Sequence, residues 1–239
     1  MHGKRVLVTG SSRGIGRAIA LRLAEGGWQV ATHYNQDREA AESLVAELGS
    51  AASGLYQANM GSSERSGLWD AVLQDGPVDA LVNNAGIYKP AAFHEASLKE
   101  TFDVNFVGPY ELTQKAVASF LQRGSGKVLM VGSRVGFKGE GGAATYAASK
   151  AALLNLVRSL AVEYADRNIG FFGIAPGWVQ TAMSRDGMPG RLDEILKTLP
   201  LGRMATPEDC AAAVAFLLSD EAAYLSGQTI DINGASYFH

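Results

Sequence analysis

The chain has 239 residues, 47% of them apolar, and carries 21 basic and 24 acidic side chains. That length accommodates one large α/β domain over residues 1–239 and does not require a second. The charges form no block of one sign, which argues against nucleic acid and acidic membrane surfaces as partners. No apolar run approaches the roughly 18 residues that span a bilayer, and no signal peptide is evident, so we expect a cytoplasmic protein. The single cysteine, Cys210, lies in an alanine-rich stretch and is expected to be buried.

Short β-branched runs alternate with longer helical patterns along the whole chain. Strands are predicted at 5–9, 29–33, 55–58, 80–82, 127–131, 170–174 and 228–232. Helices are predicted at 14–25, 37–48, 64–73, 97–122, 145–164 and 206–218. This alternation is typical of βαβ units. The predicted fold is a single doubly wound Rossmann-type α/β domain, in which helices flank a seven-stranded parallel sheet.

Two helices carry recognisable start signals. Ser97 and Glu100 have the spacing of a capping box, in which side chains satisfy the free N–H groups of the first turn. Thr206 is followed by Pro207, a residue that suits the first helical position. Residues 132–144 and 177–200 do not fit the alternation of strands and helices. Both follow strands at their carboxyl ends, where open α/β sheets bind ligands.

A glycine-rich turn joins the first predicted strand to the first predicted helix. Gly10 permits a tight turn, while Gly14 and Gly16 allow a pyrophosphate to approach the backbone and the helix to pack on the sheet. The helix N-terminus then offers free N–H groups to the anion. A tight βα turn without a ligand is the alternative, but the position of the glycines favours a dinucleotide site.

The spacing of these glycines is G-x-x-x-G-x-G, and it resembles that of the short-chain dehydrogenase/reductase family of the single-domain type. The resemblance continues through nearly the whole chain. It implies a nicotinamide dinucleotide cofactor and a hydride-transfer reaction between a carbonyl and an alcohol. No metal site is expected.

The end of the second strand bears on which nicotinamide cofactor is used. In the family, an acidic residue there holds the ribose 2′-hydroxyl of NAD. This chain has Tyr34 and Asn35, with no carboxylate before Asp37. A 2′-phosphate would therefore meet no repulsion, and Arg13 is placed to pair with it, helped by Asn35 or Arg38. We therefore favour NADP(H) over NAD(H), although Arg13 also has a plain interpretation as a solvated loop arginine.

Further cofactor contacts follow from the resemblance. Asn59 and Met60 stand where the family has an aspartate near the adenine, and Asn83-Asn84-Ala85-Gly86 resembles its N-N-A-G turn. For Asn83 we favour a structural role over direct cofactor contact. The full predicted set is Gly10, Ser12, Arg13, Gly14, Ile15, Gly16, Tyr34, Asn35, Asn59, Met60, Asn83, Ala85, Gly86, Tyr146, Lys150, Pro176, Gly177, Val179 and Thr181.

Tyr146 and Lys150 lie one turn apart on one predicted helix and therefore share a face. An ordinary phenol has a pKa near 10 and is a poor acid–base catalyst at neutral pH, and a nearby ammonium lowers that pKa. The pattern Y-x-x-x-K is common by chance. It gains weight from Ser133, which lies 13 residues before the tyrosine, the usual separation in the family. Asn105 matches the family's asparagine that holds a water linked to the lysine.

The resemblance assigns catalysis to Asn105, Ser133, Tyr146 and Lys150. Tyr146 and Ser133 would donate hydrogen bonds to the substrate oxygen, and Tyr146 would deliver the proton. Lys150 would activate the tyrosine and bind the nicotinamide ribose. The same groups serve the reverse reaction, so the residues do not set its direction.

The segment from Pro176 to Thr181 resembles the P-G-x-x-x-T sequence of the family. Val179 is expected beside the nicotinamide carboxamide, and Thr181 is expected to bind the carboxamide or the diphosphate. Residues 178–200 are expected to form a mobile substrate lid. The lid side chains Trp178, Met183, Met188 and Leu192 indicate an apolar pocket wall, which weakly disfavours sugars.

Within the family, the chain most resembles 3-oxoacyl-(acyl-carrier-protein) reductases and acetoacetyl-CoA reductases. A small ketone or an acyl thioester is therefore the expected substrate, with sugars and steroids as alternatives. Arg123 and Arg167 would meet an acyl carrier protein, or would be solvated helix ends. By family analogy, the helices near 98–122 and 145–164 pair in a homotetramer. A non-enzymatic NADP-binding sensor or scaffold is the other class of hypothesis.

Overall fold

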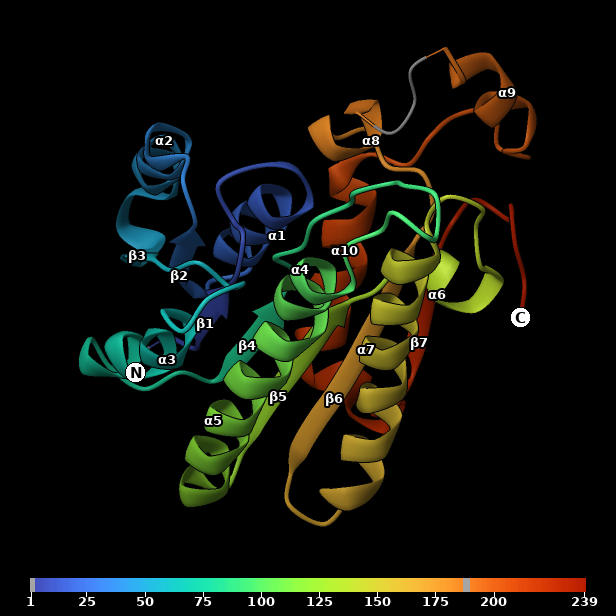
Figure 1. The fold of residues 1–239 in the computed structure, drawn as a ribbon. Coiled ribbons are helices and arrows are strands. Elements are labelled where there is room, and N and C mark those ends of the chain that lie inside the picture. The colour runs from blue at the N-terminus through green and yellow to red at the C-terminus, as the bar shows by residue number, and fades with distance from the viewer. Residues whose placement is uncertain (1–2, 187–189) are drawn as a thin grey trace.

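A computed structural model describes residues 3–186 and 190–239, and Figure 1 shows their arrangement. Seven parallel strands form one sheet in the order β3-β2-β1-β4-β5-β6-β7. The strands are β1 (Arg5–Val8), β2 (Gln29–Tyr34), β3 (Ala52–Gln57), β4 (Ala80–Asn83), β5 (Gly126–Val131), β6 (Ile169–Pro176) and β7 (Thr229–Ile232). The predicted fold class and number of strands are confirmed.

The helices that flank the sheet follow the predicted order. They are α1 (Gly14–Glu25), α2 (Arg38–Leu48), α3 (Arg65–Gln74), α4 (Leu98–Phe102), α5 (Gly108–Arg123), α6 (Val135–Lys138), α7 (Ala144–Glu163), α8 (Ala182–Asp186), α9 (Leu192–Lys197) and α10 (Pro207–Leu218). Short 3₁₀ segments occur at Gly49–Ala51 and Asp220–Leu225. The described chain therefore has more helices than the six predicted. The additional helices α6, α8 and α9 lie in the two stretches that the alternation left unassigned.

The predicted helix at 97–122 is divided in the structure. A π-helical turn at Asp103–Val107 separates α4 from α5, and Pro109 stands in the first turn of α5. Proline has no N–H, so it cannot donate to the carbonyl of Asn105 four residues earlier. The missing bond accounts for the local widening. Turns of this kind occur frequently at functional sites.

The predicted capping box at Ser97 is absent, which corrects that prediction. The Ser97 side chain makes no cap hydrogen bond, and Glu100 pairs with Lys89 instead of with the helix start. At α10 the predicted start is confirmed as a full capping box. Thr206 Oγ1 accepts from the N–H of Asp209 at 3.3 Å, and the Asp209 carboxylate accepts from the N–H of Thr206 at 2.8 Å.

The third strand starts three residues earlier than predicted. Residues 52–54 are Ala-Ser-Gly and lack the β-branched and aromatic side chains that mark strands, and the β2–β3 register shifts between Val30 and Thr32. An irregularity of this kind accommodates an extra residue without ending the strand. A period-2 reading of the sequence therefore missed the first half of β3.

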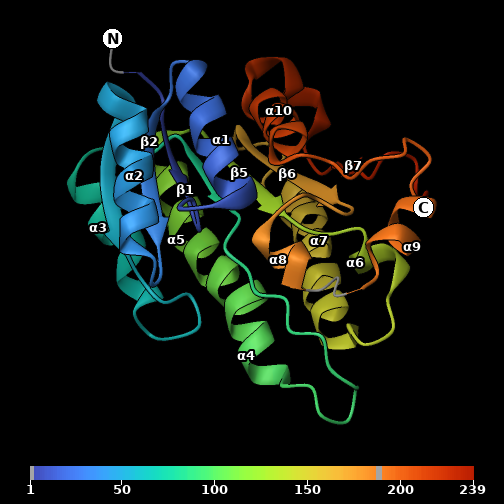
Figure 2. The same ribbon diagram turned by 90° about the horizontal axis from the view of Figure 1, so that it is seen from above.

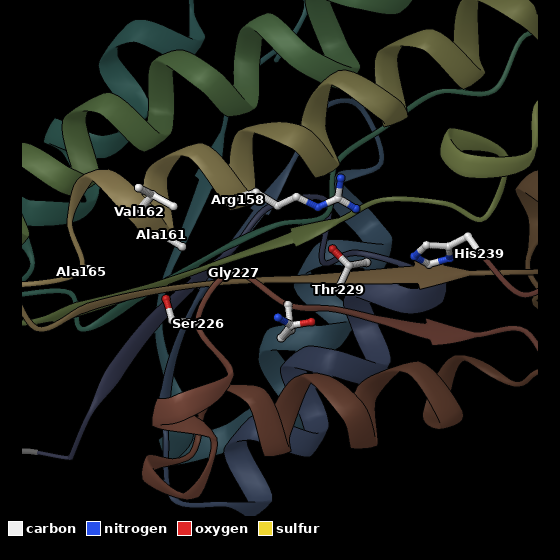
Figure 3. A pocket seen from close by; sticks show the side chains of 9 residues that line it. Arg158, Ala161, Val162, Ala165, Ser226, Gly227, Thr229 and His239 are labelled. Carbon is white, nitrogen blue, oxygen red and sulfur yellow. The ribbon is translucent and has the colours of Figure 1, made fainter.

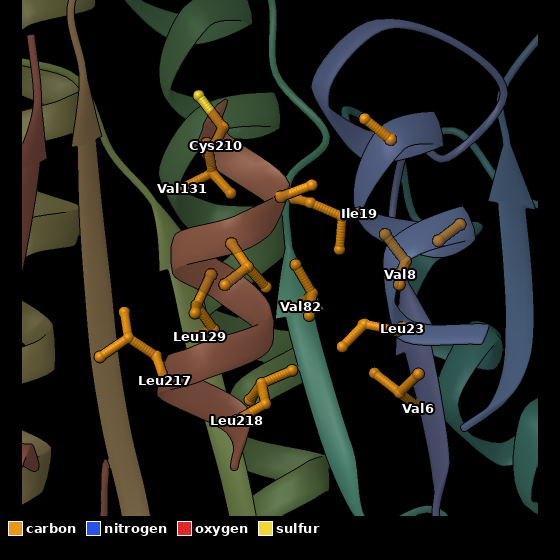
Figure 4. Packing of buried hydrophobic residues seen from close by; sticks show 14 of the residues in the cluster. Val6, Val8, Ile19, Leu23, Val82, Leu129, Val131, Cys210, Leu217 and Leu218 are labelled. Atoms are coloured by element: carbon orange, nitrogen blue, oxygen red, sulfur yellow. The ribbon is translucent and has the colours of Figure 1, made fainter. Parts of the chain in front are cut away.

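Two apolar layers cover the two faces of the sheet. Helices α1, α2 and α10 pack on one face, and α3, α5 and α7 pack on the other. Figure 2 shows α1 and α10 on the side opposite α5 and α7. Figure 4 shows the first layer, where Ile19 and Leu23 of α1 and Leu218 of α10 lie over the sheet. Cys210 is fully buried in this layer, as predicted.

This layering positions all the strand ends that matter for function at one edge. In Figure 1 the carboxyl ends of the strands lie together, with α8 and α9 beyond them. Within the described residues, no helix is both long and apolar enough to cross a membrane. The crossovers from β1 and β4 leave on opposite faces of the sheet, which opens a crevice where these neighbouring strands end.

The α10 capping box yields a stability prediction. Thr206→Ala removes the side-chain acceptor for an otherwise free N–H group and should lower the free energy of unfolding by about 1 kcal/mol. Ser97→Ala is the matched control because Ser97 makes no cap bond. It should change the free energy by less than about 0.5 kcal/mol. Urea unfolding of both variants measures the difference, and equal losses would contradict the assignment.

Candidate active site

The turn between β1 and α1 closes so tightly that its glycines have no substitutes. Gly10 adopts a φ of 63°, which side chains disfavour. A Cβ on Gly16 would lie 2.3 Å from the Gly10 carbonyl oxygen and 2.4 Å from Nδ2 of Asn84. The first turn of α1 therefore lies directly against the loop that precedes it, and its N-terminal N–H groups face the crevice.

Polar groups of Thr9 and Asn84 hold this glycine turn from the neighbouring strand end. Thr9 Oγ1 accepts from the backbone N–H groups of Asn84 and Ala85, each at 3.0 Å. Asn84 Nδ2 donates to the carbonyls of Thr9 and Gly10 at 2.9 and 3.0 Å. The sequence reading did not assign these roles, although both residues stand in motifs at the carboxyl ends of strands.

His33 supports the same turn from β2, and it too was missed. The N–H of Gly10 donates to His33 Nδ1 at 2.9 Å, and Nε2 lies 3.0 Å from the carbonyl of Ala58. Because Nδ1 accepts, Nε2 carries the proton and donates to Ala58. Burial lowers the pKa of His33 to about 4. The imidazole is therefore neutral near pH 7 and links the glycine turn to the end of β3.

The residues of this turn fit the diphosphate of a dinucleotide. A twelve-residue helix presents its N-terminus there, with no side chain of its own capping it. The methyl group of Thr181 would be 3.4 Å from a Cβ on Gly14, so the segment after β6 reaches the glycine turn. This contact brings together the predicted residues Gly14 and Thr181 from opposite ends of the chain.

The end of β2 offers no carboxylate to a ribose. Tyr34 is buried and Asn35 is exposed, while the side chain of Asp37 caps α2 by accepting from the N–H of Ala40 at 3.1 Å. Arg13 is exposed and makes no ion pair with the residues that the structure describes. Arg38 pairs with Glu42 at 2.7 Å, so its role beside a 2′-phosphate is less favoured than that of Arg13.

Three predicted cofactor residues turn their side chains toward the protein. Met60 is 3% exposed and packs under Gly108, which leaves little of its side chain for an adenine. Asn59 Oδ1 accepts from the N–H of Gly61 at 2.9 Å. Asn83 is buried and donates to Thr113 Oγ1 at 3.0 Å, as expected of a structural residue. Its Oδ1 has no hydrogen-bond partner within the part of the chain that the structure describes.

Ser133 and Tyr146 come together at the carboxyl end of β5, as predicted. Tyr146 is half-buried at the start of α7. Its ring lies edge-on against the ring of Tyr88, with the two ring centres 5.0 Å apart. Burial raises the pKa of Tyr146 to about 12, and the hydrogen bond with Ser133 acts in the opposite direction. The phenol is therefore fully protonated near pH 7, the state that a proton donor requires.

The net direction of the Tyr146 pKa differs from that expected beside Lys150, because burial has the larger effect. Lys150 Nζ donates to the carbonyl of Val131 at 2.8 Å and lies 5.8 Å from the centre of the Tyr146 ring. Burial lowers the pKa of Lys150 to about 8. Desolvation therefore favours the neutral form of both groups, and its effect on the pKa of the phenol outweighs that of the nearby ammonium.

Asn105 is buried in the π-helical turn and joins three elements. Its Oδ1 accepts from the N–H of Ile87 at 2.8 Å, and its Nδ2 donates to the Ile87 carbonyl at 3.0 Å and to Ser149 Oγ at 3.2 Å. A Cβ on Gly86 would lie 3.3 Å from Asn105 Oδ1 and 3.5 Å from Lys150 Nζ. The N-N-A-G turn, Asn105 and Lys150 thus converge. The Asn105 side chain is committed to protein partners, which leaves its main-chain carbonyl for any relay.

The Pro176–Thr181 segment lies beside this cluster. The N–H of Gly177 donates to the Ile232 carbonyl at 2.9 Å, and Val179 pairs with Ala205 in an isolated bridge. Trp178, in the same segment, packs on a small cluster of Ile195, Leu199 and Met204. Met183 and Leu192 are exposed. Met188, named with them in the predicted lid, lies outside the described residues.

A cavity of about 530 Å³ lies away from this chemistry. It is lined by Arg158, Ala161, Val162, Ala165, Ser226, Gly227, Gln228, Thr229 and His239. Figure 3 shows that these side chains come from α7 and from the C-terminal part of the chain. None belongs to the predicted site.

The two arginines predicted to meet a carrier protein differ in the structure. Arg123 donates to the Val78 carbonyl and pairs with Asp79 at 2.6 Å, so its guanidinium is engaged within the chain. Arg167 is exposed and pairs with the adjacent Asp166 at 3.2 Å. The contacts of the Arg123 guanidinium within the chain argue against Arg123 as a docking residue.

Comparisons with known proteins agree with this geometry. Residues 10–235 match the family model described as enoyl-(acyl carrier protein) reductase. A 3-oxoacyl-(acyl-carrier-protein) reductase of Staphylococcus epidermidis is 39% identical, over 98% of this chain and 99% of that protein.

Two solved structures have the same fold. A 3-ketoacyl-(acyl-carrier-protein) reductase from Brucella melitensis, complexed with NADH, superimposes with a TM-score of 0.92 at 30% identity, covering 99% of both chains. A protein from Beutenbergia cavernae described as an NAD(P)-dependent gluconate 5-dehydrogenase, with bound NADP, gives a TM-score of 0.92 at 35% identity, covering 98% of this chain and 96% of that one. The chain therefore belongs to the short-chain dehydrogenase/reductase family.

Proposed function

We propose that this protein reduces a ketone, of the class of 3-oxoacyl thioesters, to the corresponding alcohol with NADPH. The observation that carries the proposal is the placement of Ser133 beside Tyr146, next to buried Lys150 and at the same sheet edge as the glycine turn. The 3-oxoacyl reductases of Staphylococcus epidermidis and Brucella melitensis support the substrate class.

The preference for NADPH rests on the end of β2. No carboxylate stands free there, and the Arg13 guanidinium is available to a 2′-phosphate. The Beutenbergia cavernae protein binds NADP, whereas the Brucella melitensis reductase was solved with NADH, so relatives of this chain accept either cofactor. The charges of this chain favour the phosphorylated one.

The mechanism follows from where charge develops. When bound, NADPH supplies the hydride that adds to the carbonyl carbon. The Tyr146 and Ser133 hydroxyls donate hydrogen bonds to the carbonyl oxygen, on which negative charge grows. Tyr146, protonated because of its raised pKa, delivers the proton to that oxygen. Lys150, held by the Val131 carbonyl, places a positive charge beside the phenolate that remains.

The described residues of the proposed lid suit an acyl chain. We propose that residues 178–200 form the substrate lid, since α8 and α9 lie beyond the carboxyl ends of the strands (Figure 1). Among its described residues, Met183 and Leu192 expose apolar side chains, 42% and 48% respectively. Such side chains favour an apolar substrate over a sugar. An acyl carrier protein is the proposed donor of the thioester, with Arg167 as the remaining basic candidate for contact.

We further propose that four copies assemble and act as single-domain subunits in the cytoplasm. A groove of about 300 Å³ runs between α5 and α7, and Tyr110, Leu121 and Leu156 are among its lining residues. Tyr110 and Leu121 are 39% and 42% exposed. Exposed apolar side chains along paired helices are typical of subunit interfaces. A chain with one cysteine forms no internal disulfide, which suits a reducing compartment.

Removing the Tyr146 hydroxyl tests the proposed function directly. The wild-type protein should oxidise NADPH with acetoacetyl thioesters faster than with diketones or quinones. Tyr146→Phe should lower kcat by at least about a hundredfold, because general acid catalysis contributes that much. NADPH affinity of the variant should stay close to that of the wild type. Unchanged turnover would rule out the mechanism, and NADPH binding without turnover on any carbonyl would favour a sensor.

The pKa of Lys150 predicts a pH dependence. The group is charged below its pKa of about 8 and neutral above it. If the charge supports proton delivery, kcat for reduction is level below that pH and declines above it, by up to about tenfold per pH unit. Stopped-flow turnover across the range measures this profile. The residual activity of Lys150→Met should lack the inflection, and a rise in wild-type kcat above pH 8 would contradict the assignment.

Leu121→Glu tests the assembly. The added charges would face one another between paired helices, so the variant should elute as smaller species than the wild type. Light scattering should give the wild type a mass four times the 25.2 kDa of one chain. Arg22→Glu, which alters an exposed charge on α1, is the control and should not change the mass. A monomeric wild type would refute the proposed tetramer.

A further inference from the structure

Arg134 follows Ser133 directly and is buried, with 6% of its surface exposed. Among the described residues, its one side-chain hydrogen bond is donated by Nη1 to Ser236 Oγ, at 3.0 Å. No carboxylate among the side chains that the structure describes makes a salt bridge with it. Burial lowers the pKa of Arg134, and Glu140 is near enough to act in the opposite direction. Burying a guanidinium with so few partners costs free energy, so its retention calls for a role that an apolar side chain would not fill.

Besides Ser236, Arg134 lies against three consecutive residues of one turn. Its backbone N–H donates to the Pro176 carbonyl at 3.0 Å. Its Cδ lies 3.6 Å from the place of a Cβ on Gly177, and its guanidinium carbon lies 5.8 Å from the centre of the Trp178 ring. A guanidinium near an aromatic face is attracted electrostatically, more strongly away from water. Arg134 therefore touches the whole Pro176–Trp178 turn.

The C-terminal segment backs this contact. Asn233 Nδ2 donates to the Tyr237 carbonyl at 2.9 Å, which folds the segment around Ser236. The His239 ring stacks on Phe137 of α6, with ring centres 3.8 Å apart. Figure 1 shows the C-terminus beside α6. The acceptor for Arg134 is thus itself fixed against the helix that Arg134 precedes.

We propose that Arg134 is a positioning residue that sets the Pro176–Trp178 turn relative to Ser133, and so aligns the nicotinamide half of NADPH with the substrate carbonyl. The inference rests on the proposed function. Because Arg134 spans the ends of β5 and β6, it fixes the distance between the group that holds the carbonyl and the turn that faces the nicotinamide. The glycine turn, supported by Thr9, Asn84 and His33, is held by separate contacts.

This separation allows a test with two ligands. NADPH engages both halves of the proposed site, whereas adenosine 2′,5′-bisphosphate engages the adenosine half alone. Arg134→Met keeps the length of the side chain and removes the charge and the hydrogen bond. It should weaken NADPH binding about tenfold, the loss typical of a charged hydrogen bond, and leave bisphosphate affinity within about twofold. The fluorescence of bound NADPH should move toward that of free NADPH.

Three further variants separate positioning from folding. Ser236→Ala removes only the acceptor and should reproduce the Arg134→Met loss in weaker form. Arg134→Lys should recover part of the affinity, because it restores the charge without the planar fork. His33→Phe should weaken both ligands, since it removes support from the glycine turn.

Isothermal titration of each variant with both ligands decides between the outcomes. Equal losses for NADPH and the bisphosphate in Arg134→Met, or NADPH affinity unchanged in both Arg134→Met and Ser236→Ala, would overturn the inference. If the wild type binds neither ligand, the proposed function itself fails. If Arg134→Met does not fold, Ser236→Ala carries the test alone.

Discussion

The site depends on one close approach, where the turn after β1 meets the turn after β4. These neighbouring strands send their chains to opposite faces of the sheet, so the crevice between them exists only if both turns stay tight. Gly16 permits the approach, because a Cβ there would collide with the Gly10 carbonyl and Asn84. The Thr9 hydroxyl then closes it by accepting two N–H groups from the opposite turn. This one contact keeps the anion-binding turn rigid and holds the N-N-A-G turn next to Lys150.

Burial controls the chemistry at the other end of the crevice. It raises the pKa of Tyr146 and lowers that of Lys150, so the neutral state of each group is favoured. A protonated phenol next to Ser133 is prepared to donate a proton. An ammonium whose pKa lies close to neutral is prepared to exchange one. In water a phenol and an alkylammonium have similar pKa values. Burial moves the two pKa values apart here, and such a difference assigns the acid role to one group and the relay role to the other.

Much of this was readable from the sequence, for physical reasons. The alternation of strands and helices follows from burying a parallel sheet on both faces, and the glycine turn, Ser133, Tyr146 and Lys150 stand at strand or helix ends where spacing determines position. Contacts between distant segments were not readable. His33 looked like an ordinary strand residue, and its role depends on Gly10 and Ala58 being brought to its two ring nitrogens. The capping box expected at Ser97 does not form, and the Glu100 carboxylate pairs instead with Lys89, a residue outside the helix.

Contacts between distant segments also organise the two halves of the site, and the residues that make them belong to no sequence motif. His33 and Arg134 are both buried polar residues that join strand ends. The His33 ring contacts Gly10 after β1 and Ala58 after β3, while Arg134 reaches Pro176 of β6 through its backbone N–H and Ser236 after β7 through its side chain. The free energy of burying such groups is recovered only when all partners are in place, so each couples its turn to the packing of the whole sheet. In a parallel sheet the strand ends are otherwise independent loops. Buried connectors of this kind make them one surface, on which a ligand spanning two strand ends can be held in a single geometry.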